Sequence, residues 1–153
     1  MIKHIKCNIF ESGADVILHQ VNCQGVMGGG VARQVKERFP EVFKYYKELC
    51  DSMTDKSKLL GNVLSVCVDD THWVVNIFAQ NKFGYDGGCY TDYEALQRGF
   101  EHANRLVCGK TIAIPYLIGC VRGGGSWNIV YPMIEKAFGD GRNDVLICEY
   151  NGG

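Results

Sequence analysis

The sequence predicts a single α/β domain in which a mixed β-sheet lies between helices, and three observations lead to this fold class. The chain has 153 residues, which is the size of about one domain. Hydrophobic residues make up 46% of it and charged residues 22%, as is usual for a folded globular protein. Strand-like and helix-like segments alternate in the order β-β-α-α-β-β-α-β-α-β. We therefore expect one domain over residues 1–153.

Six runs are rich in Val, Ile and aromatic residues, which favour strands. Most of them are continuously apolar, as strands buried on both faces of an α/β sheet are. The predicted strands are Ile2–Cys7, Asp15–Asn22, Gly61–Val68, Trp73–Gln80, Thr111–Ile118 and Asp144–Tyr150.

Four segments between these strands have apolar residues at helical spacing. The predicted helices are Gly30–Phe39, a second one that starts at Pro40, Thr91–Val107 and Ile129–Phe138. Proline suits the first turn of a helix, which supports the start at Pro40. The third helix opens with the capping-box pattern Thr91-Asp92-Tyr93-Glu94. Pro132 makes the first residue of the fourth helix difficult to predict, because proline is disfavoured inside a helix.

Charge and hydropathy exclude several classes of function. The formal net charge of −1 gives no basic excess for binding nucleic acid as a bulk polyanion. No apolar run approaches the ~18–20 residues that span a bilayer. The first ten residues also lack the apolar core of a secretory signal. We therefore expect a cytoplasmic protein without a membrane partner.

The eight cysteines show neither C-x-x-C spacing nor the pairing with His that is typical of zinc sites. Without a secretory signal, a disulfide framework is not expected either. Several cysteines, among them Cys67 and Cys148, lie inside apolar runs, and we interpret them as small core side chains. We expect no metal and no cofactor.

A first glycine cluster directly follows the second predicted strand, and its members are Gly25, Gly28, Gly29 and Gly30. A strand, a glycine loop and a helix start form a phosphate-binding arrangement, because backbone N–H groups approach the ligand there and the helix dipole favours negative charge. It is not a dinucleotide fingerprint, since Arg33 stands where the third glycine would be. The alternative is a loop that needs positive φ angles without a ligand. Three consecutive glycines weaken it, because one or two suffice for a turn.

A second cluster, made of Gly119, Gly123, Gly124 and Gly125, follows the fifth predicted strand and precedes a helix. Two such loops at the carboxyl ends of strands in one sheet could face each other and clamp a diphosphate. Arg122 either pairs with a phosphate there or faces the solvent.

A third loop follows the fourth predicted strand and carries three aromatic residues, Phe83, Tyr85 and Tyr90, beside glycines. Aromatic side chains in such a loop could form a wall or lid over a sugar or base. The alternative is that they seal the edge of the core.

Both glycine clusters resemble those of the macro domain family of ADP-ribose binders. The first motif reads Asn22-Cys23-Gln24-Gly25-Val26-Met27-Gly28-Gly29-Gly30-Val31-Ala32, and the second is Gly119 to Gly125. The run from His19 to Pro40 is most similar to ADP-ribose-1''-phosphate phosphatases, and also to glutamate-type ADP-ribosyl-protein hydrolases. The resemblance implies a three-layer α/β/α fold with ADP-ribose in a cleft on the crest of the sheet.

The resemblance also implies which residues contact the ligand. Asn22 would contact the distal ribose, and backbone N–H groups of the second cluster would wrap the diphosphate. Phe10 and Tyr150 are the two candidates for an aromatic contact with adenine. The implied ADP-ribose-binding residues are Asn8, Ile9, Asn22, Gly28, Gly29, Gly30, Val31, Ile118, Gly119, Cys120, Val121, Arg122, Gly123, Gly124, Gly125, Ser126 and Tyr150.

For catalysis, the resemblance implies His19, Asn22 and Gln80 as candidates, because a histidine at the position of His19 is implicated in the phosphatases. Its alternative reading is a strand-end histidine bonded to backbone. The glutamate-type hydrolases use a Lys and an Asp, and Gln80 and Gly123 stand at those positions. The Lys–Asp mechanism is therefore poorly supported.

Two further departures concern Asn8, where many macro domains have an Asp that bonds adenine, and Ser126, where close relatives often have Asp before the tryptophan. Two readings stay open. One is a hydrolase that removes phosphate from ADP-ribose-1''-phosphate, or ADP-ribose from a modified macromolecule. The other is a module that binds ADP-ribose or a related nucleotide without turnover. We expect a monomer in either case.

Overall fold

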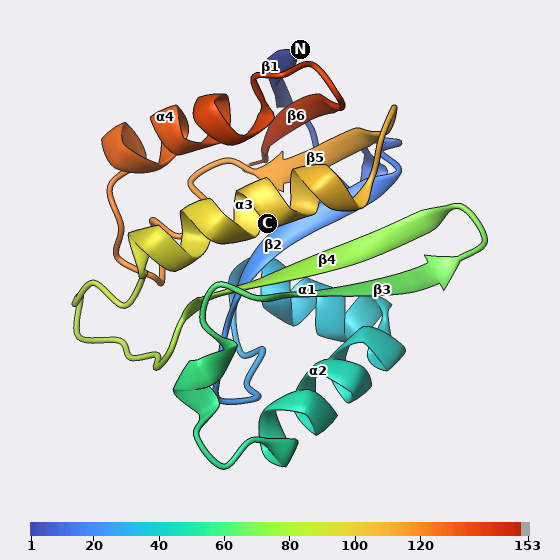
Figure 1. Cartoon of the computed structure of the whole chain (residues 1–153). Coiled ribbons are helices and arrows are strands. Elements are labelled where there is room, and N and C mark those ends of the chain that lie inside the picture. Colours follow the sequence, from blue (N-terminus) through green and yellow to red (C-terminus); the bar gives the residue numbers. More distant parts are fainter. Residues whose placement is uncertain (151–153) are drawn as a thin grey trace.

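The computed structural model describes residues 1–150, which form one six-stranded sheet (Figure 1). The strands lie in the order β1 (Ile2–Lys6), β6 (Asp144–Glu149), β5 (Thr111–Pro115), β2 (Val16–Asn22), β4 (His72–Gln80) and β3 (Val63–Asp69). All neighbouring strands are parallel except β3, which is antiparallel to β4. The mixed sheet expected from the sequence is confirmed.

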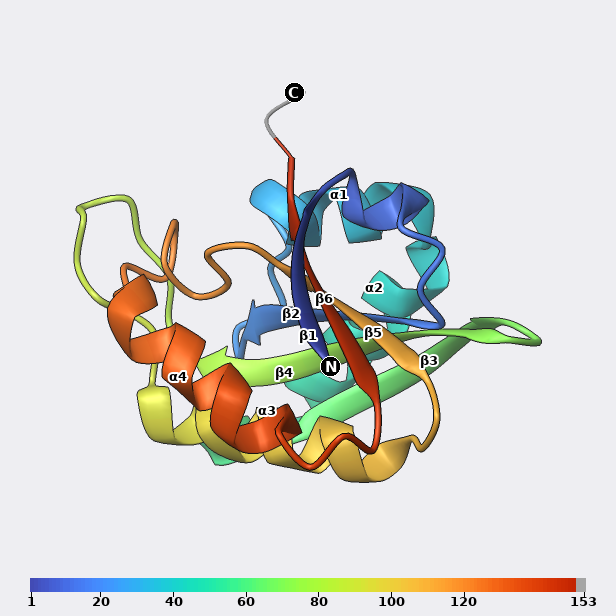
Figure 2. The same ribbon diagram turned by 90° about the horizontal axis from the view of Figure 1, so that it is seen from above.

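Helices cover both faces of this sheet, so the fold has three layers (Figure 2). The helices α1 (Gly30–Arg38) and α2 (Pro40–Ser52) pack on one face, and α3 (Tyr93–Leu106) and α4 (Trp127–Phe138) on the other. The α/β/α expectation is thereby confirmed. Two short 3-10 helices, η1 (Ile9–Glu11) and η2 (Lys56–Leu59), were not predicted.

The apolar strands supply two large clusters of buried side chains, one on each face of the sheet. Val16 and Leu18 of β2 pack towards α3 and α4, whereas Val21 of the same strand packs towards α1 and α2. Because successive side chains of a strand point to opposite faces, a strand covered on both faces is apolar at nearly every position.

The strand β5 ends at Pro115, three residues before the predicted end at Ile118. The chain turns there, since Ile118 N–H donates to the Pro115 carbonyl at 3.1 Å and Leu117 has a φ of 65°. A positive φ is unusual for a residue with a side chain and is incompatible with a strand. The apolar run therefore continues beyond the strand because Leu117 and Ile118 belong to a structured turn.

The starts of two helices differ from the sequence prediction. The N-cap of α3 is Asp92, whose carboxylate accepts from Ala95 N–H at 3.0 Å, so the helix does not include Thr91. The helix α4 begins at Trp127, two residues before Ile129, and holds Pro132 inside it. Proline has no N–H to donate to the carbonyl four residues earlier, so Pro132 suggested a helix start later than the observed one.

Three cysteines, Cys67, Cys89 and Cys108, are exposed, and the interpretation of Cys67 as a core side chain is wrong. Cys67 is exposed, because it lies on the outward side of the edge strand β3. Cys23, Cys50 and Cys148 are buried as expected.

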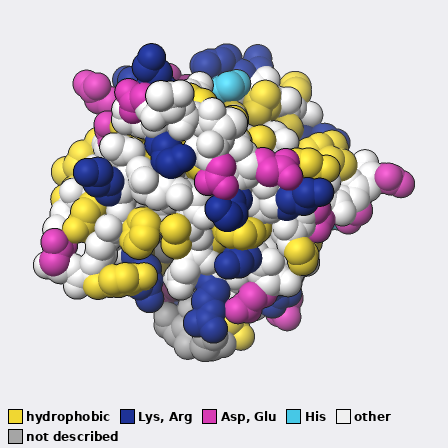
Figure 3. Space-filling view, turned by 90° about the horizontal axis from the view of Figure 1, so that it is seen from below, with side chains coloured by type: hydrophobic (Ala, Val, Ile, Leu, Met, Phe, Trp, Pro, Cys, Tyr) yellow, Lys and Arg dark blue, Asp and Glu magenta, His cyan; other side chains and the backbone are white. Residues whose placement is uncertain are grey.

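The molecular surface carries charges of both signs. On the face seen in Figure 3, Lys and Arg side chains lie between Asp and Glu side chains and scattered hydrophobic ones. That face therefore presents no broad area of one charge. Among residues 1–150, no helix has the length and hydrophobicity needed to cross a bilayer.

Candidate functional site

The three predicted catalytic residues, His19, Asn22 and Gln80, lie towards the carboxyl ends of the paired strands β2 and β4, in the middle of the sheet. The chain leaves β2 towards α1 on one face, but leaves β4 and β5 towards α3 and α4 on the other face. Such a divergence opens a crevice at the carboxyl ends of the strands. The strands β2 and β5 pair only at Val16 and Ile17, whereas β2 continues to Asn22.

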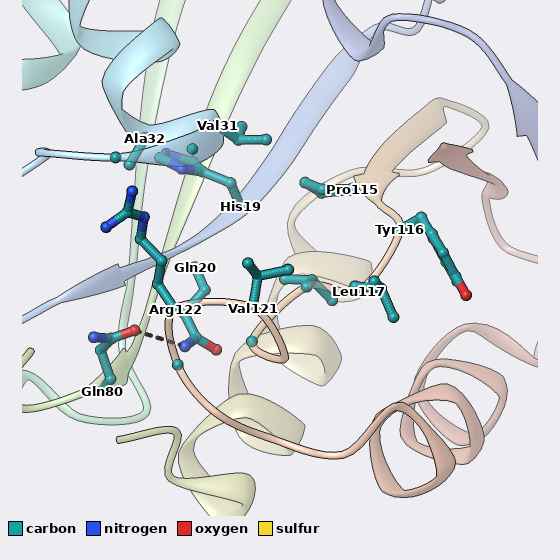
Figure 4. A pocket seen from close by; sticks show the side chains of 15 residues that line it. His19, Gln20, Val31, Ala32, Gln80, Pro115, Tyr116, Leu117, Val121 and Arg122 are labelled. Atoms are coloured by element: carbon teal, nitrogen blue, oxygen red, sulfur yellow. Dashed lines mark hydrogen bonds between the residues drawn. The ribbon is translucent and has the colours of Figure 1, made fainter. Parts of the chain in front are cut away.

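The crevice has three neighbouring compartments that share lining residues. The central compartment, of about 230 Å³, is lined by residues 19, 20, 29–32, 80, 115–119 and 121–123 (Figure 4). The Asn22 compartment, of about 100 Å³, is lined by residues 20–22, 26, 28, 29, 32, 80, 83–85 and 122. The Tyr150 compartment, of about 290 Å³, is lined by residues 8, 9, 31, 34, 115–117, 121 and 148–150. The central compartment therefore lies between the other two.

The first glycine loop ends at the N-terminus of α1 and lines the central compartment. Gly29 is the N-cap, and the N–H groups of Gly30, Val31 and Ala32 belong to the first turn, where a helix offers them no partner. These groups and the helix dipole favour an anion. Gly30 has a φ of 58°, which a glycine adopts without strain.

Asn22 both lines the crevice and braces the first glycine loop. Its Oδ1 accepts from Gln24 N–H at 2.9 Å and from the Tyr46 hydroxyl at 2.8 Å. Its Nδ2 donates to the Val26 carbonyl at 2.8 Å. Tyr46 is fully buried, and this burial raises the pKa of its hydroxyl, which stays a donor. Asn22 thus determines the shape of the first glycine loop, and this role does not depend on a contact between Asn22 and a ligand.

The second glycine loop is closed by hydrogen bonds to its own ends and to Thr91. Gly125 N–H donates to the Gly119 carbonyl at 2.9 Å, and Thr91 Oγ1 donates to the same carbonyl at 2.7 Å. The Gly123 carbonyl accepts from Thr91 N–H at 3.0 Å. Gln20 Nε2 lies beneath the loop and donates to Thr91 Oγ1 at 2.9 Å. Because Asp92 and not Thr91 caps α3, the Thr91 side chain is available to hold the loop that closes the central compartment.

His19 lines the central compartment with one ring nitrogen unpartnered. Asn76 Nδ2 donates to the Leu64 carbonyl at 2.9 Å, so Asn76 Oδ1 faces His19 Nε2 at 2.6 Å and accepts from it. His19 Nε2 therefore carries the hydrogen, and Nδ1 is a buried acceptor without a partner among the described residues. Burial lowers the pKa of His19 to about 4, although the bond to Asn76 raises it, so the ring is neutral at pH 7.

The lowered pKa of His19 predicts a specific pH dependence of stability. The unfolded chain takes up a proton on this ring below about pH 6.5, and the folded chain only below about pH 4. The free energy of unfolding should therefore fall between pH 6.5 and pH 4, by up to about 3 kcal/mol at ~1.36 kcal/mol per pKa unit. Urea unfolding of the wild type and of His19→Gln across this range checks it. Ring NMR signals of His19 that titrate near pH 6.5 would contradict it.

Arg122 reaches from the second glycine loop across the crevice, as Figure 4 shows. It lines both the central and the Asn22 compartments, and its guanidinium carbon lies 5.1 Å from the centre of the Tyr85 ring. Phe83 and Tyr85 are exposed and line the Asn22 compartment, and their role as a wall over a sugar or base stays a prediction. Tyr90 instead donates its hydroxyl to Asp86 at 2.8 Å, within the third loop.

Gln80 lies on the floor between the central and Asn22 compartments. Its Oε1 accepts from Gln20 Nε2 at 2.9 Å, and its Nε2 donates to the Lys82 carbonyl at 3.0 Å. Neither Lys82 nor any other lysine is among the residues that line these compartments. The position that the resemblance assigns to a catalytic lysine thus holds a neutral, hydrogen-bonded amide.

The Tyr150 compartment brings together Asn8, Ile9 and Tyr150, whereas Phe10 does not line it. Asn8 Oδ1 accepts from Phe10 N–H at 3.0 Å and caps η1. The oxygen of the Asn8 amide is therefore already used within the protein. Gln34 also lines the compartment.

Four predicted ligand contacts lie outside the lining of the three compartments. They are Cys120, Gly124, Gly125 and Ser126. The Cys120 thiol donates to the Ile118 carbonyl at 3.4 Å, and burial raises its pKa to about 11. The N–H groups of Gly125 and Ser126 are bonded within the protein, to Gly119 and Tyr93. A direct contact of these four residues with a ligand stays a prediction.

Several residues of the site were not predicted from the sequence. The sequence did contain a feature that could have identified Asn76, because it is a polar residue inside an otherwise apolar buried strand. Gln20 is next to His19 but points to the other face of the sheet, where it meets Gln80. No sequence feature pointed to Thr91 as a residue of the site, because the capping pattern assigned it to the helix. Among residues 1–150, no group of three or more His, Cys, Asp or Glu side chains is placed to hold a metal ion.

Comparison with known proteins places this geometry in context. No family model matches the chain. Over 73 residues it is 37% identical to an ADP-ribose 1''-phosphate phosphatase of Debaryomyces hansenii, covering 43% of this chain and 41% of that protein. Over 50 residues it is 38% identical to a DNA ADP-ribosyl glycohydrolase of Mycobacterium tuberculosis, covering 33% and 14%. The chain spans less than half of the curated relatives that it matches.

Solved structures match the chain over nearly its whole length. The macrodomain of Mycobacterium tuberculosis DarG has a TM-score of 0.80 at 21% identity, and the match covers 97% of each chain. The structure titled Thermosipho africanus DarTG in complex with ADP-ribose has a TM-score of 0.78 at 20% identity, over 97% of this chain and 41% of that one. With its mixed six-stranded sheet between two helical layers, the chain has the macrodomain fold.

Proposed function

We propose that this protein binds ADP-ribose in the three-compartment crevice and removes the phosphate from ADP-ribose 1''-phosphate. The observation that carries the proposal is the unpartnered Nδ1 of His19, a buried neutral base in a compartment that two glycine loops enclose. A buried acceptor without a donor is costly, and a ligand or water that donates to it removes this cost. The names of the sequence relatives support the substrate class.

The layout of the crevice supports ADP-ribose as the ligand. A long ligand with an apolar-faced base at one end and a sugar at the other fits three compartments in a row. The adenine would occupy the Tyr150 compartment and the distal ribose the Asn22 compartment. The diphosphate would then lie in the part of the central compartment next to the N-terminal turn of α1. The 1''-phosphate would lie where the central compartment borders the Asn22 compartment, within reach of His19.

The proposed reaction uses His19 as a general base. Its Nδ1 takes a proton from water while the water oxygen forms a bond to phosphorus. The bond between phosphorus and the ribose oxygen breaks, and the proton passes to that oxygen, which gives ADP-ribose and inorganic phosphate. Free His19 is a weak base because burial lowers its pKa, but a bound phosphate dianion raises that pKa by its charge. Asn76 keeps the tautomer in which Nδ1 is the acceptor.

Two observations bear on the other candidate functions. Removal of ADP-ribose from a macromolecule by a Lys–Asp pair is disfavoured, because Gln80 and Gly123 stand at those positions. A binding module without turnover is the second candidate. It is favoured by the lining of the central and Asn22 compartments, which includes no Asp or Glu to act as an acid.

Calorimetric titration with ADP-ribose, with AMP and ribose 5-phosphate as controls, tests the binding. We expect micromolar or tighter affinity for ADP-ribose and much weaker binding of both fragments, because each fragment fills only part of the crevice. Multiple-turnover release of phosphate from ADP-ribose 1''-phosphate then separates the hydrolase from the binding module. No heat at millimolar ADP-ribose would overturn the proposal as a whole.

A further inference from the structure

The central and Asn22 compartments have an unusual charge balance. Of all their lining side chains, Arg122 alone is charged at pH 7, since His19 is neutral there. No carboxylate among the described residues forms an ion pair with Arg122. Arg122 is exposed, but a guanidinium without a counter-charge in a concave site attracts an anion more strongly than one on a flat surface.

Arg122 makes two contacts where it crosses the crevice. Its guanidinium lies over the ring of Tyr85, and its Nε lies close enough to Gly29 that a Cβ there would be 2.5 Å away. The side chain therefore spans from the second glycine loop to the first, and it uses the lack of a side chain at Gly29. Its five N–H donors form a planar fork that suits the oxygens of a phosphate.

The position along the crevice decides which phosphate Arg122 meets. It lines the central and Asn22 compartments but not the Tyr150 compartment. The diphosphate has the backbone N–H groups at the start of α1. Arg122 lies towards the other end, where the distal ribose would be placed, and it shares the central compartment with His19.

We propose that Arg122 is the residue that selects a phosphomonoester on the distal ribose, and so distinguishes ADP-ribose 1''-phosphate from ADP-ribose. This assignment rests on the proposed function. A terminal phosphate dianion accepts two charge-assisted hydrogen bonds from the fork, whereas a ribose hydroxyl accepts at most a single weaker one. Tyr85 orients the guanidinium by stacking, and Gly29 leaves room for it.

Binding of the two ligands to Arg122 variants tests the assignment. Every protein carries His19→Ala, which should slow turnover by about 10²–10⁴-fold, and calorimetry gives the affinity for ADP-ribose and for ADP-ribose 1''-phosphate. We expect the unchanged Arg122 protein to prefer the phosphorylated ligand by about tenfold to a hundredfold, the range of a charged hydrogen-bonded pair. Arg122→Gln should abolish this preference, because it weakens binding of ADP-ribose 1''-phosphate far more than binding of ADP-ribose.

Two matched variants sharpen the result. Arg122→Lys should keep only part of the preference, because an ammonium is a point charge without the fork. Arg33→Gln, which removes an exposed arginine that pairs with Glu37 on α1, should keep all of it. The preference should also weaken as salt is raised.

The outcomes separate this assignment from the proposed function. Equal loss of both ligands in Arg122→Gln, or loss of neither, would overturn the role of Arg122 while ADP-ribose binding stands. A protein with Arg122 in place that binds ADP-ribose without preferring its 1''-phosphate would overturn it too. If that protein binds neither ligand, the proposed function fails together with the assignment.

Discussion

Replacing His19 by Ala should lower phosphate release from ADP-ribose 1''-phosphate by about 10²–10⁴-fold, the usual contribution of a positioned general base. The reason is the tautomer that Asn76 imposes, which leaves Nδ1 as the one unpartnered acceptor of this ring. Binding of ADP-ribose should change much less, because the glycine loops and the start of α1 are untouched. Steady-state kinetics with phosphate detection, together with calorimetry, measures both effects.

The control for this prediction is His72→Ala. His72 lies at the opposite end of β4, where it is paired with Asp69, and it does not line the crevice. This variant should keep full turnover. A His19→Ala protein that retains more than a tenth of the wild-type kcat would contradict the role of His19 as the base.

A second variant extends the same argument through Asn76. Asn76→Asp places a carboxylate against Nε2 and should raise the pKa of His19, because a negative charge favours the charged ring. The acid limb of the pH–rate profile should then move to higher pH. A merely structural role of Asn76 would lower activity without moving that limb.

Gly123→Ala should weaken ADP-ribose binding by about tenfold to a hundredfold, which corresponds to the 1–3 kcal/mol typical of overpacking. A Cβ at this position would overlap Thr91 Oγ1, and it would stand 2.6 Å from the Gly119 carbonyl oxygen and 2.9 Å from Gln20 Nε2. The loop must therefore move away from Thr91 and Gln20, and the central compartment changes shape. Calorimetry with ADP-ribose checks this.

The matched control is Gly13→Ala, far from the crevice lining. Gly13 has a φ of 75° and open space around its Cβ position, so alanine costs stability there without touching the site. Urea unfolding of both variants shows whether loss of binding follows loss of stability. Unchanged ADP-ribose affinity in a folded Gly123→Ala protein would show that the second glycine loop does not shape the site.

Local patterns in the sequence determined most of the fold. The strands are apolar throughout because helices cover both faces of the sheet. Such continuously apolar segments can be recognised in the sequence alone. The two glycine loops could also be identified from the sequence, because a chain that turns sharply and leaves its N–H groups open needs glycine. Errors arose at element ends, where Leu117 turns an apolar run out of a strand and Asp92 takes the cap from Thr91.

Only the tertiary structure decided how the polar residues of the site act. His19 and Asn76 are 57 residues apart, and strand pairing brings them together and leaves Nδ1 of His19 without a partner. Arg122 became the charged group of two compartments because its loop folds towards Gly29 and Tyr85. Sequence patterns report on neighbours along the chain, because propensity and periodicity are local. Tautomer, burial and an unpaired charge depend on contacts between distant segments, which exist only once the sheet has formed.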